Sequence, residues 1–149
     1  MKILSLFAAL SLFHLASITS SPAAEAWQTD YNKALEQAGK ENKLVLLDFT
    51  GSDWCTWCIK LDKDTFSRPE FAKFADTNLI LVKLDFPARK PQPEALKAQN
   101  EALATKFGVQ GFPTLVLVDA VGKEVGRHVG YLAGGPDSFI KWVEKARQL

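Results

Sequence analysis

Cys55 and Cys58, with two residues between them, form a C-x-x-C motif that can carry redox chemistry. They are the only 2 cysteines in the chain. Residues three apart on a helix share one face, with about 5–6 Å between Cβ atoms, so a small adjustment allows both sulfurs to bond. A disulfide across such a short loop adds only about 2 kcal/mol to stability in the chain-entropy model. The pair is therefore better explained by redox chemistry than by a structural role.

The residues before the cysteines predict that the pair opens a helix. Residues 44–49 (LVLLDF) form an apolar run typical of a strand covered on both faces, and residues 50–53 form a turn. In the first turn of a helix, unpaired N–H groups and the helix dipole favour a thiolate and can lower a cysteine pKa from about 8.5 to about 3.5–7.5. Because the thiolate is the attacking species, we expect Cys55 to be the nucleophile and Cys58 the resolving thiol.

A zinc site and a haem attachment site are the other uses of this spacing. Zinc needs further ligands, and the chain has only two histidines, His14 and His128. If the N-terminal segment that contains His14 is a cleaved export signal, only His128 remains. Haem attachment needs a histidine directly after the second cysteine, where this chain has Ile59. The sequence therefore predicts no metal and no organic cofactor, only the redox-active disulfide itself.

The first residues are typical of a cleaved export signal. Lys2 supplies a positive start, residues 3–15 form a mostly apolar run, and residues 24–26 (AEA) offer small side chains to a signal peptidase. A membrane anchor is the alternative, but the run is shorter than the roughly 20 apolar residues that span a bilayer. We expect a signal peptide at 1–26, one domain at 27–149 and no stable membrane insertion.

Composition and charge narrow the possible partners. The 149 residues are 47% hydrophobic and 23% charged, which favours one globular domain over a disordered chain. The net charge is +1, with basic and acidic residues interleaved. Because a phosphate backbone requires a concentrated basic face, we expect no nucleic acid partner.

The rest of the chain alternates helical and strand patterns. Thr29 or Asp30 can cap a first helix that ends near Gly39, and Ser67 can cap a helix after the active-site helix. The proline-rich residues 87–93 fit only an exposed connector. Helices are expected at 30–39, 55–64, 70–75, 94–107 and 137–148, and strands at 44–49, 79–86, 114–118 and 124–129. The last two strands fit an antiparallel hairpin, so this order predicts an α/β fold with a mixed central sheet flanked by helices on both faces.

Four motifs in this order resemble the thioredoxin family over nearly all of residues 27–149. They are LVLLDF at 44–49 followed by DWCTWC at 53–58, VKLDF at 82–86, FGVQGFPTLVLVD at 107–119 and HVGYLAGGPDSFIKWVEKA at 128–146. Within the family, GSDWCTWC followed by KLDKDTF is similar to exported bacterial thioredoxin-like proteins and to the C-terminal domain of the membrane thiol:disulfide interchange protein. The resemblance implies a thioredoxin fold and thiol–disulfide oxidoreductase activity.

The resemblance assigns Asp48 and Lys83 to the catalytic group. Asp48 matches a buried aspartate that helps to move a proton from the resolving cysteine. An aspartate in an apolar strand is costly unless paired, and burial raises its pKa, so we expect Lys83 in the next strand to be its partner. The alternative is that both side chains lie in water at strand ends. Asp48 is also one residue further from Cys55 than in thioredoxin proper, which could rotate it out of line.

Substrate-binding residues also follow from the resemblance. It places a cis-proline at Pro113, which exposes the backbone of Phe112 to a substrate strand, and a glycine beside the substrate groove at Gly130. A trans proline that starts a strand is the alternative. Trp54 and Trp57 would offer an apolar rim to extended substrates, although Trp54 could instead belong to the core.

The dipeptide between the cysteines bears on the direction of electron flow. Thr56 and Trp57 stand where thioredoxin proper has Gly-Pro and where oxidising or isomerase-type members carry a histidine, which raises the reduction potential. The absence of that histidine favours a reductase or electron shuttle. Elsewhere we expect His128 on the surface of a strand and Trp142 in the core.

The sequence therefore predicts a protein-disulfide reductase or electron shuttle, exported to the bacterial periplasm. Its substrates would be protein disulfides. Because that compartment is oxidising, a reductase there would need an electron donor, most simply a membrane thiol–disulfide carrier. A disulfide oxidase or isomerase, and a thioredoxin-fold binding module without redox turnover, are the alternatives.

Overall fold

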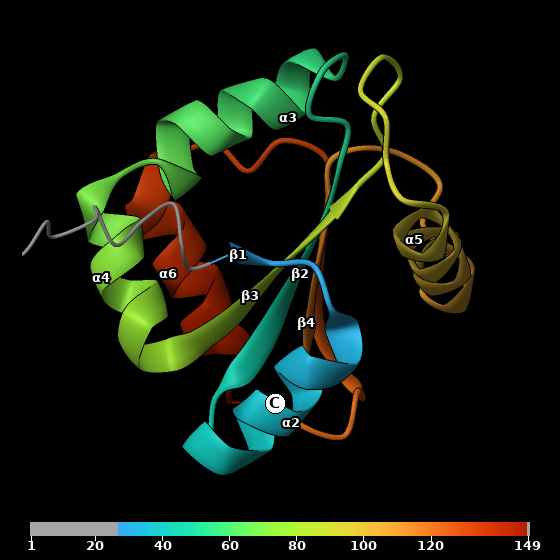
Figure 1. Cartoon of the computed structure of the whole chain (residues 1–149). Coiled ribbons are helices and arrows are strands. Elements are labelled where there is room, and N and C mark those ends of the chain that lie inside the picture. The colour runs from blue at the N-terminus through green and yellow to red at the C-terminus, as the bar shows by residue number, and fades with distance from the viewer. Residues whose placement is uncertain (1–26, 149) are drawn as a thin grey trace, which may run out of the picture.

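A five-stranded mixed sheet forms the centre of the fold, with the strand order β1-β3-β2-β4-β5 (Figure 1). The computed structural model describes residues 27–148, so the expected signal peptide lies outside the described residues. The strands are β1 (Trp27–Gln28), β2 (Leu44–Thr50), β3 (Leu79–Asp85), β4 (Thr114–Val118) and β5 (Glu124–Val129). The first three run parallel to one another, whereas β4 is antiparallel to both β2 and β5. The predicted mixed sheet and terminal hairpin are confirmed.

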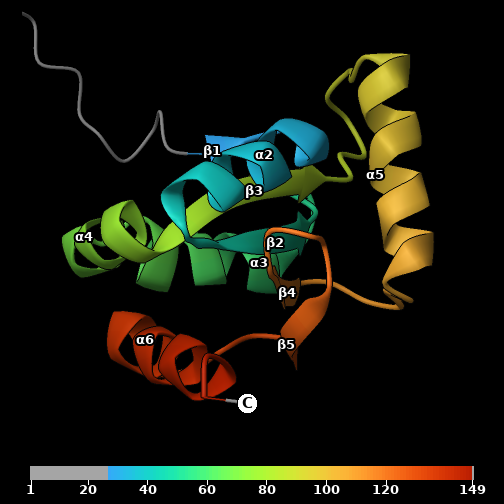
Figure 2. The same ribbon diagram turned by 90° about the horizontal axis from the view of Figure 1, so that it is seen from below.

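Helices cover both faces of this sheet. They are α2 (Tyr31–Glu41), α3 (Thr56–Leu61) with its π-helical continuation η1 (Asp62–Phe66), α4 (Pro69–Asn78), α5 (Glu94–Lys106) and α6 (Gly135–Ala146). Buried side chains of α2 and α5 pack with Val45, Leu47 and Phe49 on one face, and those of α3, η1, α4 and α6 pack with Leu46 on the other. Figure 2 shows α2 on one side of the sheet and α4 and α6 on the opposite side. Strand β2 is therefore buried on both faces, as its apolar run predicts.

Asp30, one of the two predicted caps, begins α2 by accepting from the backbone N–H of Lys33 (3.1 Å), whereas two other helix ends differ from expectation. The helix passes through Gly39 and ends where Asn42 adopts a left-handed conformation (φ 52°). Ser67 does not cap α4, because its hydroxyl is hydrogen-bonded to the Asp62 carboxylate instead (3.2 Å).

Trp142 and His128 are both partly buried. Trp142 packs partly buried against the core, as expected. His128 is not a solvated surface residue: it is half-buried, its ring lies 6.4 Å from that of Trp142, and its Nε2 has no hydrogen-bond partner within residues 27–148. Strand β1 was not predicted. No helix within the described residues has the length and apolar character needed to cross a bilayer.

Phe139→Ala should lower the free energy of unfolding by about 3–5 kcal/mol, as measured in urea. Phe139 is fully buried, and its ring contacts those of Phe66, Phe71 and Trp142. Val121→Ala is the control, because Val121 is 84% exposed, and should change stability by less than about 0.5 kcal/mol. Similar small losses in both variants would contradict the described core.

Candidate active site

Cys55 and Cys58 form a disulfide at the start of α3. Cys55 is the residue that caps the helix, and the backbone N–H of Cys58 donates to its sulfur at 3.2 Å. The two Cα atoms are 5.2 Å apart. Cys55 is 6% exposed and Cys58 only 4%. The structure thus confirms that a buried strand delivers the pair to a helix start, where a backbone N–H group faces the sulfur of Cys55.

The turn between β2 and α3 is held by Trp54. The indole N–H donates to the carbonyl of Phe86 at 2.8 Å, and the ring meets that of Phe112 edge-on at 5.8 Å. The ring also lies against Gly51, where an added Cβ would come within 2.5 Å of it, so the turn requires glycine there. Because Trp54 is 47% exposed, it is a rim residue rather than a core residue.

Asp53 fastens the proline-rich connector to the same turn. Its carboxylate accepts from three consecutive backbone N–H groups of the connector, those of Ala88 (2.9 Å), Arg89 (2.8 Å) and Lys90 (3.0 Å). These bonds hold the pKa of Asp53 below its ordinary value. No role for Asp53 was predicted from the sequence. Its position directly before the active-site tryptophan was the only signal available.

Asp48 is a buried carboxylate in the middle of β2. It is 3% exposed, and its Oδ1 has no hydrogen-bond partner within residues 27–148. Burial raises its pKa to about 7, with the positive charge of Lys83 acting in the opposite direction. The alternative in which Asp48 lies in water is therefore wrong.

The expected ion pair between Asp48 and Lys83 is absent, although the two residues are direct neighbours in the sheet register. The ammonium of Lys83 instead lies 3.6 Å from Oδ1 of Asp62 on η1. Both of these side chains are part-exposed, at 32% and 48%. A pair near water avoids the desolvation that pairing with a buried carboxylate would require. Asp62 was missed because its role depends on where the π-helical segment points it.

The cis-proline segment lies beside the turn. The peptide bond between Phe112 and Pro113 is cis, as expected. The carbonyl of Pro113 accepts from the N–H of Gly130 at 2.8 Å, and Gly130 has φ +87°, a conformation that favours glycine. The backbone N–H and carbonyl of Phe112 make no hydrogen bond within the described part of the chain.

The two residues between the cysteines are both exposed. Thr56 is the first residue of α3, and Trp57 is 56% exposed with its ring 5.5 Å from that of Tyr131. The structure therefore places the predicted substrate-binding side chains of Trp54, Thr56 and Trp57 on the surface, whereas Phe112 is half-buried and Pro113 is buried. Tyr131 was not predicted to take part.

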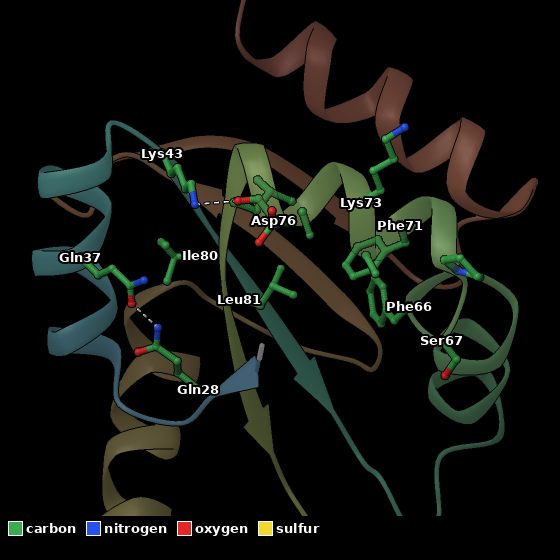
Figure 3. Close-up of a pocket in the computed structure, with 14 residues that line it drawn as sticks. Gln28, Gln37, Lys43, Phe66, Ser67, Phe71, Lys73, Asp76, Ile80 and Leu81 are labelled. Atoms are coloured by element: carbon green, nitrogen blue, oxygen red, sulfur yellow. Dashed lines mark hydrogen bonds between the residues drawn. The ribbon is translucent and has the colours of Figure 1, made fainter. Parts of the chain in front are cut away.

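The rest of the described chain carries no second pair of cysteines. Within residues 27–148, no group of three or more histidine, cysteine or acidic residues could hold a metal ion. A groove of about 720 Å³ lies between α2, α4 and the outer edge of β3 (Figure 3). Hydrogen bonds cross its rim from Gln28 to Gln37 (2.6 Å) and from Lys43 to the carbonyl of Asp76 (2.7 Å). None of the predicted site residues lines this groove.

Comparison with known proteins bears on this geometry. A family model of the thioredoxin-like domain matches residues 31–147. Disulfide bond reductase DsbH of Chlamydia pneumoniae is 40% identical over 123 residues, which cover 83% of this chain and 73% of that protein. Thiol:disulfide interchange protein DsbD of Cronobacter sakazakii is 35% identical over 105 residues, which cover 69% of this chain but only 16% of that protein.

Solved structures are also similar to this chain in fold. The structure of a DsbH oxidoreductase has a TM-score of 0.77 and 38% identity, with coverage of 93% of this chain and 96% of that one. The reduced C-terminal domain of DsbD from Neisseria meningitidis has a TM-score of 0.59 and 30% identity, with coverage of 77% and 92%. The predicted thioredoxin fold is confirmed, and the chain belongs to the thioredoxin-like domain family.

Proposed function

We propose that this chain is a thiol–disulfide oxidoreductase that reduces disulfides in other proteins through Cys55 and Cys58. The observation that carries the proposal is the disulfide at the start of α3, in which the sulfur of Cys55 accepts the N–H of Cys58. A structural staple would not need a backbone donor aimed at one of its sulfurs. The relatives named as a disulfide bond reductase and as thiol:disulfide interchange proteins support the same activity.

The reaction passes two electrons from the dithiol to the substrate. The Cys55 thiolate attacks one sulfur of the substrate disulfide, that S–S bond breaks, and the other substrate sulfur leaves and takes up a proton. The Cys58 thiolate then attacks the sulfur of Cys55. The Cys55–Cys58 bond forms, and the second substrate sulfur leaves as a thiol. No organic cofactor or metal takes part in these steps.

Asp48 supplies a proton acceptor for the second step. With a pKa of about 7, its carboxyl group is partly ionised near neutral pH and can take up the proton that Cys58 must lose. Lys83 acts on this group across the sheet, and its contact with Asp62 keeps the ammonium near water. The buried Oδ1 without a partner is free to accept that proton.

An extended segment of the substrate pairs with the backbone of Phe112. Pro113 presents this backbone, and the bond from Gly130 to Pro113 keeps the adjoining loop in place. Trp54, Thr56 and Trp57 then border the substrate segment. Their exposure beside the buried sulfurs supports this role.

The proposal includes the direction of electron transfer, which is from the dithiol to the substrate, and the compartment, which is the bacterial periplasm. The reductase name of a 40% identical relative favours reduction over oxidation or isomerisation, in line with the missing histidine between the cysteines. Residues 1–26 act as a signal peptide that exports the domain at 27–149 to the bacterial periplasm. A membrane thiol–disulfide carrier restores the dithiol there, because the compartment is oxidising.

The two cysteines should respond differently to substitution. Cys58→Ser should accumulate covalent complexes with other proteins in cells, because the mixed disulfide forms but is not resolved. Cys55→Ser should form none and should lose the ability of the purified protein to reduce insulin. Non-reducing gel electrophoresis and an insulin turbidity assay measure both results. Equal trapping by the two variants, or insulin reduction by Cys55→Ser, would rule out the proposed roles.

Asp48→Asn should change how stability depends on pH. The folded-state pKa of about 7 lies above the ordinary value of 3.8, so the folded wild type binds more protons than the unfolded chain between these values. Its free energy of unfolding therefore falls as pH rises from 4 to 7. The variant lacks this fall. The difference in free energy of unfolding, variant minus wild type, should therefore be about 4 kcal/mol larger at pH 8 than at pH 4.

Urea unfolding of the oxidised proteins across this pH range measures the difference. Asp53→Asn is a matched control, because the pKa of Asp53 is lowered rather than raised and its contribution should follow the opposite trend. A constant difference between Asp48→Asn and wild type from pH 4 to pH 8 would show that Asp48 is not held neutral by burial.

A further inference from the structure

The exposed apolar side chains gather around the cysteines. Among residues 27–148, five large hydrophobic side chains are exposed: Trp54, Trp57, Ile59, Val121 and Val129. The first three belong to the active-site segment, and Val129 directly precedes Gly130. Clustered apolar exposure marks a surface that a partner covers, whereas single exposed residues need no explanation.

One aromatic group borders the cysteines on the side of the cis-proline. Trp54 is fixed by its hydrogen bond to Phe86 and by its edge-on contact with Phe112. The rings of Phe86 and Phe112 are 5.1 Å apart. We call Trp54, Phe86 and Phe112 the first wall.

A second aromatic group is held by a network that the proposed reaction does not use. The ring of Trp57 lies 5.5 Å from that of Tyr131, and the hydroxyl of Tyr131 donates to the Asp64 carboxylate at 2.6 Å. Lys60 is ion-paired with the same carboxylate (2.5 Å) and lies 5.2 Å from the centre of the Tyr131 ring. We call Trp57 and Tyr131 the second wall.

Holding the second wall in place has a consequence for binding. Tyr131 follows Gly130, whose backbone is tied to Pro113, so the loop and the side chain are both fixed before any substrate arrives. A ring that is already ordered loses less conformational entropy when a ligand covers it. Because Trp57 remains 56% exposed, this order does little for the core and leaves its face open to a ligand.

We infer that the second wall selects substrates in which large apolar side chains accompany the disulfide cysteine into the site. The inference deepens the proposed function and rests on it. The free backbone of Phe112 fits an extended substrate segment, in which alternate side chains share a face. The side chains that enter with the cysteine are therefore those two positions before and two positions after it. Trp57 contacts them, and Tyr131 is a positioning residue.

Three peptide disulfides test this selection on the purified, reduced protein. Each probe is a symmetric dimer joined through one cysteine, with a lysine at both ends for solubility. The sequences around the cysteine are Phe-Gly-Cys-Gly-Phe, Gly-Phe-Cys-Phe-Gly and Ser-Gly-Cys-Gly-Ser. Released peptide thiol is quantified by chromatography after acid quenching, which gives a second-order rate constant for each probe.

Wild type should reduce the first probe about tenfold faster than the serine probe and clearly faster than the second probe, which has the same composition. In Trp57→Ala, the rate constant for the first probe should be less than about three times that for the serine probe. Tyr131→Phe keeps the ring but removes the bond to Asp64, so its ratio should be intermediate. Val121→Ala, which truncates the exposed apolar residue away from the site, should keep the wild-type ratio.

The outcomes separate this inference from the proposed function. If wild type reduces all three probes at equal rates, or if Trp57→Ala slows every probe by the same factor, the selection does not exist while the reductase activity stands. If wild type reduces both phenylalanine probes at the same rate, the second wall does not distinguish the two faces of an extended segment, and the inference is wrong. If wild type reduces none of the probes, the proposed function itself fails.

Discussion

At the start of α3, the backbone N–H of Cys58 points at the sulfur of Cys55, and the rest of the structure supports that arrangement. Strand β2 is buried on both faces, so the sheet fixes where the turn begins. Gly51 lets the Trp54 ring close over the turn, and Asp53 ties the connector to it through three backbone N–H groups. The helix start is thereby held in one position relative to the sheet, which is what a repeatedly broken and re-formed disulfide requires.

The same sheet holds a carboxyl group that is costly to bury. Asp48 has an oxygen without a hydrogen-bond partner in the described chain, and its neighbour Lys83 turns to Asp62. A direct pair with Lys83 would favour the ionised carboxylate and lower the pKa of Asp48. Without that pair, burial keeps the pKa near neutrality. Burial of Asp48 therefore costs stability at the position where the proposed reaction needs a proton acceptor, a compromise common at functional sites.

The strands and the position of the cysteines could be predicted from local sequence patterns. Side-chain contacts that depend on the tertiary fold could not. The central strands were found to within about a residue because buried strands are apolar runs, and the cysteines were placed by the strand before them. Strand β1 has only 2 residues and no pattern to detect. The partner of Lys83 depends on the course of η1, and Tyr131 meets Trp57 only through tertiary folding. His128 was misassigned for the same reason.

The pH dependence of alkylation at Cys55 measures whether the start of α3 favours the thiolate of this residue. The reduced protein would be treated with iodoacetamide between pH 4 and pH 10, and mass spectrometry would assign the modified sulfur at each time point. We expect the rate at Cys55 to rise with a midpoint at least about one pH unit below 8.5, the ordinary cysteine pKa. A midpoint at or above about 8.5 would show that the helix start does not favour the thiolate.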